Sequence, residues 1–334
     1  MCVQRFIFLA ALCFPMAAHC LCEMDCSALC DEVVVESTTH FPGGPFVEAS
    51  FIYWQPAFGD YPVAALFHEI GTTGDRESVD VQGLHFPFAP GFQLGVGYDL
   101  PCWALDLFVN WTWLRSNPHR TVVSDSQNIV LNLFQDAPKL FASEADSTGH
   151  IELNCCDVEF GKTFCAPCNG FIRLFAGLKA IWLNYDFNTA FLNPTNGSDL
   201  PYANLNNASK DQIWGIGPRI GFNTQWCLGT EQLTLLLNGA AALLWEKFSP
   251  TVSSTYTLNG DPHGGIEHAH IKEINPVVEF FVGLNYACYL NGAHAQATIG
   301  YEMQYWADQL HNTFINSNEP LTLQGLTVTL ALSF

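Results

Sequence analysis

Charged residues, and bases above all, are scarce in this sequence. Only 13% of the 334 residues are charged, and 12 Lys and Arg face 32 Asp and Glu, for a formal net charge of −20. Binding to phosphate groups requires the opposite sign, so a nucleic-acid partner is excluded. Because 49% of the residues are hydrophobic and 13% are aromatic, the composition also excludes a disordered chain.

Long apolar runs are missing after the first twenty residues. The longest run, Leu233–Trp245, is interrupted by Asn238 and is shorter than the roughly 18–20 residues that cross a bilayer as a helix. Without such a helix, a chain of this apolar composition can span a membrane only as a closed β-barrel.

Catalytic motifs are absent too. The sequence has no Gly-x-Ser-x-Gly, no His-Glu-x-x-His and no phosphate-binding loop of the Walker type. His263, His268 and His270 could hold a metal, and Asp308 with His311 is similar to the acid and histidine pairs of outer-membrane proteases. Neither group has a spacing that enforces a site, so we expect no catalytic residue, no metal and no cofactor.

The first twenty residues have the order of a secretory signal peptide. Arg5 precedes the apolar run Phe6–Ala18, after which small residues suit a cleavage site, whereas a buried N-terminal helix is the alternative. We expect residues 1–20 to be removed, 21–45 to form a cysteine-containing periplasmic segment, and 46–334 to form one domain. Export would place the 13 cysteines in an oxidising compartment.

Apolar residues recur at every second position along the rest of the chain. From Trp103 to Trp113 every odd position is apolar, and Asp106, Asn110 and Thr112 fall between. With weaker segments, the pattern predicts ten strands of nine residues or more, near 46–54, 92–100, 103–113, 150–162, 172–182, 214–226, 233–245, 278–286, 295–305 and 326–334. This length suits tilted membrane strands, which need about 9–11 residues.

One of these segments changes phase. Ile151 and Leu153 lie on one parity, whereas Val158 and Phe160 lie on the other. We therefore expect a β-bulge at Cys155–Cys156.

Short and long connections alternate between the predicted strands. The short ones are 101–102, 163–169, 227–230 and 290–292, and the long ones are 55–90, 115–149, 187–211, 249–269 and 307–320. The outward aromatic residues form an upper belt (Tyr53, Trp111, Trp113, Trp182, Trp214, Trp245 and Tyr305) and a lower belt (Tyr98, Trp103, Trp226, Tyr286 and Phe334). A soluble antiparallel sandwich does not require these features together. They predict an all-β chain that forms a transmembrane antiparallel up-and-down β-barrel of about ten strands in the cell outer membrane.

Several segments also resemble the Legionella-type major outer membrane protein family of pore-forming barrels. They are GFQLGVGYDLPCWALDLFVNWTWL (91–114), RLFAGLKAIWLNYDF (173–187), WGIGPRIGFNTQWCLG (214–229), GYEMQYW (300–306) and LQGLTVTLALSF (323–334). The cysteine content departs from that pattern and is similar to the disulfide-rich envelope proteins of chlamydia-like bacteria. The resemblance implies a porin that passes small hydrophilic solutes, and it implies no catalytic residue.

The parity of the strands predicts which residues face the lumen. The charged pore-lining candidates are Asp106, Arg173, Lys179, Arg219, Glu279 and Glu302, together with Glu48 and Glu246. The bases lie on two neighbouring strands and the acids are in excess, so we expect a weak preference for cations. Most strand glycines share the inward parity, which would either leave a narrow aqueous path or only permit tight curvature around a plugged lumen.

The cysteines suggest a second role. The disulfide candidates are Cys22, Cys26, Cys30, Cys102, Cys165, Cys168, Cys227 and Cys288, all of which the topology places on the periplasmic side. They could tie the N-terminal segment to the turns or link neighbouring envelope proteins, so a structural or adhesive envelope barrel is the alternative function. The expected partners are outer-membrane lipid, the barrel-assembly machinery and disulfide-linked envelope proteins.

Overall fold

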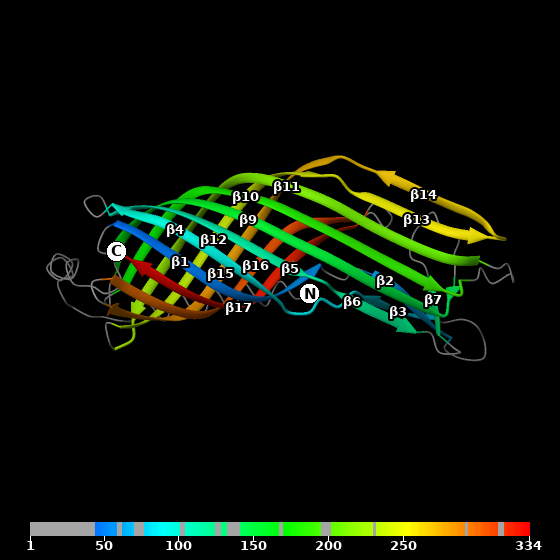
Figure 1. Ribbon diagram of the computed structural model, residues 1–334, viewed down its shortest axis with the longest axis horizontal. Helices are drawn as coiled ribbons and strands as arrows, with labels where there is room; N and C mark the ends of the chain where they lie inside the picture. The colour runs from blue at the N-terminus through cyan, green and yellow to red at the C-terminus, as the bar shows by residue number, and fades with distance from the viewer. Residues whose placement is uncertain are drawn as a thin grey trace.

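The computed structural model is all-β over the residues that it describes (Figure 1). These residues are 44–58, 62–69, 77–100, 104–123, 128–131, 141–166, 170–194, 202–229, 232–290, 293–312 and 317–334. Within them, no helix has the length and hydropathy needed to cross a membrane. The predicted signal peptide and the predicted segment 21–45 lie outside the described residues, apart from the last two positions of that segment.

Ten long strands form a closed ring. They are β1 (Gly44–Phe58), β4 (Ala89–Leu100), β5 (Leu105–Ser116), β9 (Glu144–Ala166), β10 (Gly170–Leu192), β11 (Tyr202–Cys227), β12 (Leu233–Phe248), β15 (Ile271–Leu290), β16 (Ala293–Asn312) and β17 (Ser317–Ser333). Each pairs antiparallel with the next, and β17 returns to β1, where Ser333 lies opposite Phe46. This is the up-and-down barrel of ten strands that the sequence predicts.

Seven further strands lie mostly at the end of the barrel opposite Phe334, which we call the upper end (Figure 1). β2 (Pro62–Glu69), β3 (Glu77–Gly83), β7 (Asn128–Leu131) and β8 (Phe141–Ala142) form a small separate sheet. β6 (His119–Val123) pairs with β9, and the hairpin of β13 (Thr251–Leu258) and β14 (Asp261–His268) extends the sheet from β11.

The predicted upper loops are too long. β10 runs to Leu192 and β11 begins at Tyr202, so most of the expected loop 187–211 is strand, and the expected loop 249–269 contains the β13–β14 hairpin. Backbone pairing therefore continues well beyond the upper belt. The period of two could not reveal this extension, because outward residues there are polar rather than apolar.

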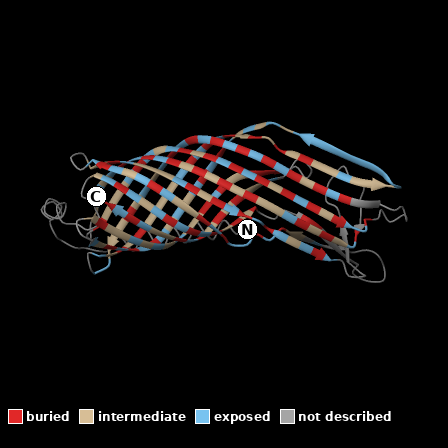
Figure 2. Ribbon diagram, in the orientation of Figure 1, coloured by how far each residue is buried: buried red, intermediate tan, exposed pale blue. Residues whose placement is uncertain are grey.

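Buried and exposed residues alternate along the ring strands (Figure 2). The outward side chains between the two belts are apolar: Leu94, Leu178 and Ile220 are 48%, 51% and 63% exposed, and exposed aromatic residues flank them above and below. Trp214 and Trp245 of the upper belt lie edge to face with ring centroids 5.5 Å apart. The lower belt includes Tyr98 and Tyr286, both about half exposed. This apolar band is the surface that a bilayer covers.

Along strand β9, the inward residues change from apolar to polar and the outward residues change from polar to apolar. Above the upper belt, Ile151 and Leu153 point inward and are 1% exposed, whereas further down Val158 and Phe160 point outward at 38% and 52%. Pairing with β5 and β10 runs without a register shift through Cys155–Cys156. The predicted bulge is therefore wrong: the strand keeps one parity, and the apolar face changes sides where the strand leaves the bilayer.

The upper part of the barrel has an apolar core. All ten ring strands contribute buried side chains to it, among them Ile52, Phe58, Leu183, Leu244 and Trp306, each 0% exposed. Burial of such a core stabilises long strands outside the membrane, by about 1.5–3 kcal/mol for each large apolar side chain. The barrel thus consists of a membrane part with a polar interior and an upper part with an apolar interior.

Candidate functional site

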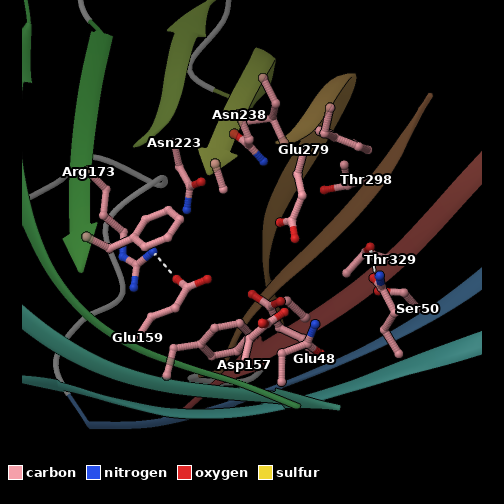
Figure 3. Close-up of a pocket in the computed structure, with 18 of the residues that line it drawn as sticks. Glu48, Ser50, Asp157, Glu159, Arg173, Asn223, Asn238, Glu279, Thr298 and Thr329 are labelled. Atoms are coloured by element: carbon pink, nitrogen blue, oxygen red, sulfur yellow. Dashed lines mark hydrogen bonds and ion pairs between the residues drawn. The ribbon is translucent and has the colours of Figure 1, made fainter. Parts of the chain in front are cut away.

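The membrane part of the barrel encloses a polar cavity of about 320 Å³, to which all ten ring strands contribute (Figure 3). Period-two alternation explains its chemistry, since the residues between the lipid-facing ones must point inward. Carboxylates, guanidinium groups, amides and hydroxyls line it, together with several phenyl rings.

Two carboxylates hold Arg173 on the wall of the cavity. Its Nε donates to Asp106 Oδ2 at 2.8 Å and its Nη2 to Asp106 Oδ1 at 2.5 Å, while Nη1 lies 2.7 Å from Glu159 Oε2. The side chains of these three residues are 16%, 10% and 8% exposed. A guanidinium bound to one carboxylate through two nitrogens has a fixed orientation as well as a neutralised charge.

Arg219 and Lys179 continue the network across the barrel. Arg219 pairs with Glu159, lies 2.5 Å from Glu279 Oε2 through Nη2, and lies 3.8 Å from Asp157 Oδ1 through Nε. Lys179 Nζ lies 2.9 Å from Asp157 Oδ1 and 2.6 Å from Glu279 Oε1. The network joins the five strands β5, β9, β10, β11 and β15, so a shift of any one of these strands would break at least one ion pair.

Aromatic rings support the three cations. Phe175 lies between the two arginines, with its ring centroid 5.1 Å from Arg173 Cζ and 4.9 Å from Arg219 Cζ. Lys179 Nζ lies 5.5 Å from the ring centroid of Trp306, which belongs to the apolar core above. Lys179 therefore stands at the boundary between the polar cavity and that core.

Glu48 and Glu302 face the cavity and form no ion pair with a base in the described part of the chain. Glu302 accepts hydrogen bonds from Gln304 at 2.8 Å and Thr327 at 3.1 Å, and Glu48 lines the cavity beside Ser50. Asp99 also lines the cavity. With Asp106, Asp157, Glu159 and Glu279, seven carboxylates stand against three bases, which leaves a formal excess of four negative charges.

The predicted pore-lining residues come together at this site. Asp106, Arg173, Arg219, Glu279 and Glu302 line the cavity, whereas Lys179 is 1% exposed and stands behind Asp157 and Glu279. Their role in conduction stays a prediction.

One inward acid lies elsewhere. Glu246 is 0% exposed above the upper belt, where Asn275 and Gln309 donate to its Oε2 at 2.7 and 2.9 Å. It therefore does not belong to the cavity.

Sequence reasoning missed Asp157 and Glu159, the two carboxylates at the centre of the network. The phase change in the segment 150–162 concealed them, because it suggested a bulge. The outward positions of Val158 and Phe160 were the signal that could have found them, since their neighbours must then point inward.

The inward glycines serve packing more than open space. A Cβ on Gly97 would lie 2.1 Å from Phe46 Cζ, and a Cβ on Gly177 would lie 1.8 Å from the carbonyl oxygen of Val158. The first glycine accommodates a phenyl ring and the second a close approach of two strands. The inward glycines therefore permit crowding and curvature, as the second interpretation of the sequence expects, but the lumen beside them is not plugged, because the polar cavity occupies it.

The apolar core closes the lumen at the upper end. The side chains that meet there come from every ring strand, and many are fully buried. The polar cavity consequently ends at the level of Lys179 and Trp306 in the described conformation.

A buried polar group interrupts this core on β11. Asp211 is 1% exposed, accepts a 2.7 Å hydrogen bond from the backbone nitrogen of Ser249, and lies 3.4 Å from the Tyr185 hydroxyl. It lies three residues beyond Trp214 of the upper belt, outside the membrane part. Burial raises the pKa of Asp211 to about 6, although these hydrogen bonds and nearby His311 act in the other direction.

Only three of the eight disulfide candidates lie in the described part of the chain. Cys165 is disulfide-bonded, Cys288 is a free thiol, and Cys227 ends β11. The other candidates, Cys22, Cys26, Cys30, Cys102 and Cys168, lie outside the described residues.

The candidate histidines of the β13–β14 hairpin have separate partners. His263 stacks on Tyr256, and His268 forms a hydrogen bond with Thr251 at the other end of the hairpin. No cluster of three or more His, Cys, Asp or Glu that could hold a metal occurs in the described part of the chain.

The histidine of the protease-like pair contacts a different acid. His311 Nε2 lies 3.2 Å from Glu273 Oε2, and its ring centroid lies 4.2 Å from that of Phe248, with the two ring planes tilted by 60°. Asp308 lies at an irregularity of the β16–β17 pairing, with a φ of 50°.

A known protein family matches most of this chain. Residues 45–334 match the family described as Legionella pneumophila major outer membrane protein precursor. None of the curated proteins matches the sequence.

Solved structures are similar only at low identity. The outer membrane protease OmpT from Escherichia coli is 10% identical, with a TM-score of 0.45, over 89% of this chain and 99% of that chain. A Pseudomonas aeruginosa FadL homologue is 7% identical, with a TM-score of 0.25, over 89% of this chain and 93% of that chain. Likenesses at this level say nothing about the activity of this chain.

Proposed function

The chain belongs to the family of the Legionella pneumophila major outer membrane protein, and from this premise we propose that it is an outer-membrane channel for small hydrophilic solutes with a weak preference for cations. It is an outer-membrane protein, and its upper end faces the outside of the cell, because short turns of such barrels lie on the periplasmic side.

The observation that carries the proposal is the polar cavity between the belts. A barrel of ten strands can fill its interior with side chains, yet here about 320 Å³ remains, with charged and amide groups around it (Figure 3). Groups of this kind replace the hydration shell of a solute as it enters a narrow lumen.

The charge of the lining supports the preference for cations. Seven carboxylates oppose three bases, but four of the carboxylates are held in ion pairs, so the net field is small. Glu48 and Glu302, which form no ion pair among the described residues, contribute to the excess that a passing cation would meet.

The apolar core above the cavity means that conduction requires movement. A solute that passes from the cell exterior to the cavity must displace side chains such as Leu183 and Leu244, which are 0% exposed. We therefore propose that the described conformation is the closed state of the channel.

Reversal potentials across a planar bilayer test the proposal. Purified, refolded protein should give discrete conductance steps, and its reversal potential in a salt gradient should indicate a modest cation preference. The double variant Glu279→Gln/Glu302→Gln should shift the potential toward anions, because it removes two lumen carboxylates. Glu144→Gln, at the upper end of β9, is the control and should leave the potential unchanged.

The second candidate is a structural or adhesive envelope barrel linked by periplasmic disulfides. The filled upper core favours it, because a closed lumen suits a structural role. Absence of conductance steps under all voltages would support this candidate over the channel. We propose no catalytic role, and the acid that His311 contacts is Glu273.

A further inference from the structure

We propose that the cavity binds an uncharged polyhydroxylated solute of about monosaccharide to disaccharide size. The inference rests on the proposed channel and names the class of solute that its lumen selects. Its volume of about 320 Å³ lies at the low end of the ~300–1,000 Å³ range of small-molecule sites.

The charged groups of the cavity are already paired with one another. Arg173 contacts two carboxylates, Arg219 contacts three, and Lys179 contacts Asp157 and Glu279. An anionic solute would have to separate these buried pairs to reach a base, which leaves carboxylates unpaired. A neutral solute can hydrogen-bond to the same groups while every pair stays intact.

Seven amide side chains from five strands line the cavity: Gln93, Asn110, Asn223, Gln225, Asn238, Gln296 and Gln304. Each offers both a donor and an acceptor, which matches the hydroxyl group, itself a donor and an acceptor. The amide oxygens of Gln225 and Asn238 are buried and have no partner among the described residues, so rotation of these amides toward a ligand hydroxyl would break no hydrogen bond of either oxygen.

Phenyl rings supply the apolar part of the cavity lining. Phe46 and Phe108 stack with centroids 5.6 Å apart, and Phe171, Phe175 and Phe281 also line the cavity. A sugar ring has a face of C–H groups between its hydroxyls, and such a face packs on aromatic carbon while the hydroxyls contact the amides. Figure 3 shows the polar partners, including Asn223, Asn238 and Thr298, arranged around one common space.

Saturation-transfer NMR on the refolded full-length chain tests the inference without relying on conduction. D-glucose and maltose should show transfer, whereas acetate and lysine at the same concentration should bind at least tenfold more weakly. Gln225→Leu and Asn238→Leu should each weaken glucose binding at least tenfold. Gln212→Leu is the control, because Gln212 is exposed on the outer surface of β11.

The outcomes separate the two proposals. Equal or tighter binding of lysine would overturn the inference, because the acidic excess would then govern the cavity, and so would tight binding of acetate. Conductance without glucose binding would refute the polyol site and leave the channel. Glucose binding without conductance would support the site and contradict the channel. If a leucine variant fails to refold, the ranking of the four probes on the unaltered chain still decides.

Discussion

Removal of Lys179 should destabilise the barrel far more than removal of a surface lysine. Lys179 is 1% exposed and contacts both Asp157 and Glu279. In Lys179→Met, Glu279 keeps Arg219 at 2.5 Å, but Asp157 retains only long contacts, with Arg219 at 3.8 Å and with the Cys155 thiol at 3.9 Å. Breaking a buried pair in this way costs about 3–5 kcal/mol, because a desolvated carboxylate is left without compensation.

The chain provides a matched control. Lys210 pairs with Asp186 at 2.7 Å, but its side chain is 60% exposed on the outside of the barrel. Exposed pairs contribute only about 0–1 kcal/mol, so Lys210→Met should be nearly neutral.

The assay is equilibrium unfolding in urea from lipid vesicles, followed by tryptophan fluorescence. Addition of Asp157→Asn to Lys179→Met should recover about 1–3 kcal/mol, because the unpaired charge is then absent. If Lys179→Met and Lys210→Met unfold at the same urea concentration, or if the second substitution recovers nothing, the network does not hold the strands together as described.

Three further predictions address targeting, pH and the cysteines. Deletion of Phe334, which ends the apolar stripe of β17, should reduce the amount of protein in the outer membrane, and normal levels on membrane fractionation would contradict this role. Because burial raises the pKa of Asp211 to about 6, its contribution to stability is fully present below its unfolded value near 3.8 and is lost as the pH rises through 6. The urea midpoint should therefore fall by the equivalent of about 2–3 kcal/mol across that range, and Asp211→Asn should remove this part of the slope. Non-reducing gels of native envelopes should show high-mass species that collapse to a monomer with reductant, and a monomer under both conditions would exclude intermolecular disulfides.

The membrane part of the fold was predictable from the sequence because one physical constraint governs it. Lipid outside and water inside enforce alternation, so Leu94, Leu178 and Ile220 identify their strands without knowledge of tertiary contacts. The same parity placed Arg173 and Arg219 correctly in the lumen.

The upper part was not predictable in this way. There the inward residues are the apolar ones, as Ile151 and Leu153 show, and the outward residues are polar. Because the apolar residues change from the inward to the outward face where the strand leaves the bilayer, the period-two pattern of the sequence shifts by one residue there. This reversal concealed Asp157 and Glu159, extended the predicted loops and suggested a bulge that does not exist.

The period-two pattern could not predict the closure of the lumen either, because closure depends on contacts between side chains of different strands. Whether an inward glycine leaves a gap depends on which neighbour fills it, as Phe46 fills the space beside Gly97. Such neighbours belong to strands that are distant in sequence, and only the register of the ring brings them together.

The central claim is that the polar lumen conducts and that the apolar core above it is the barrier. Single-barrel conductance in planar bilayers tests this directly when the unaltered chain is compared with Leu183→Ala/Leu244→Ala, which truncates two fully buried core residues. Leu178→Ala, on the lipid-facing side, is the control. We predict small discrete steps for the unaltered chain and for the control, and larger or longer openings for the core variant. Identical traces from the core variant and the control, or no steps from any of the three, would contradict the account.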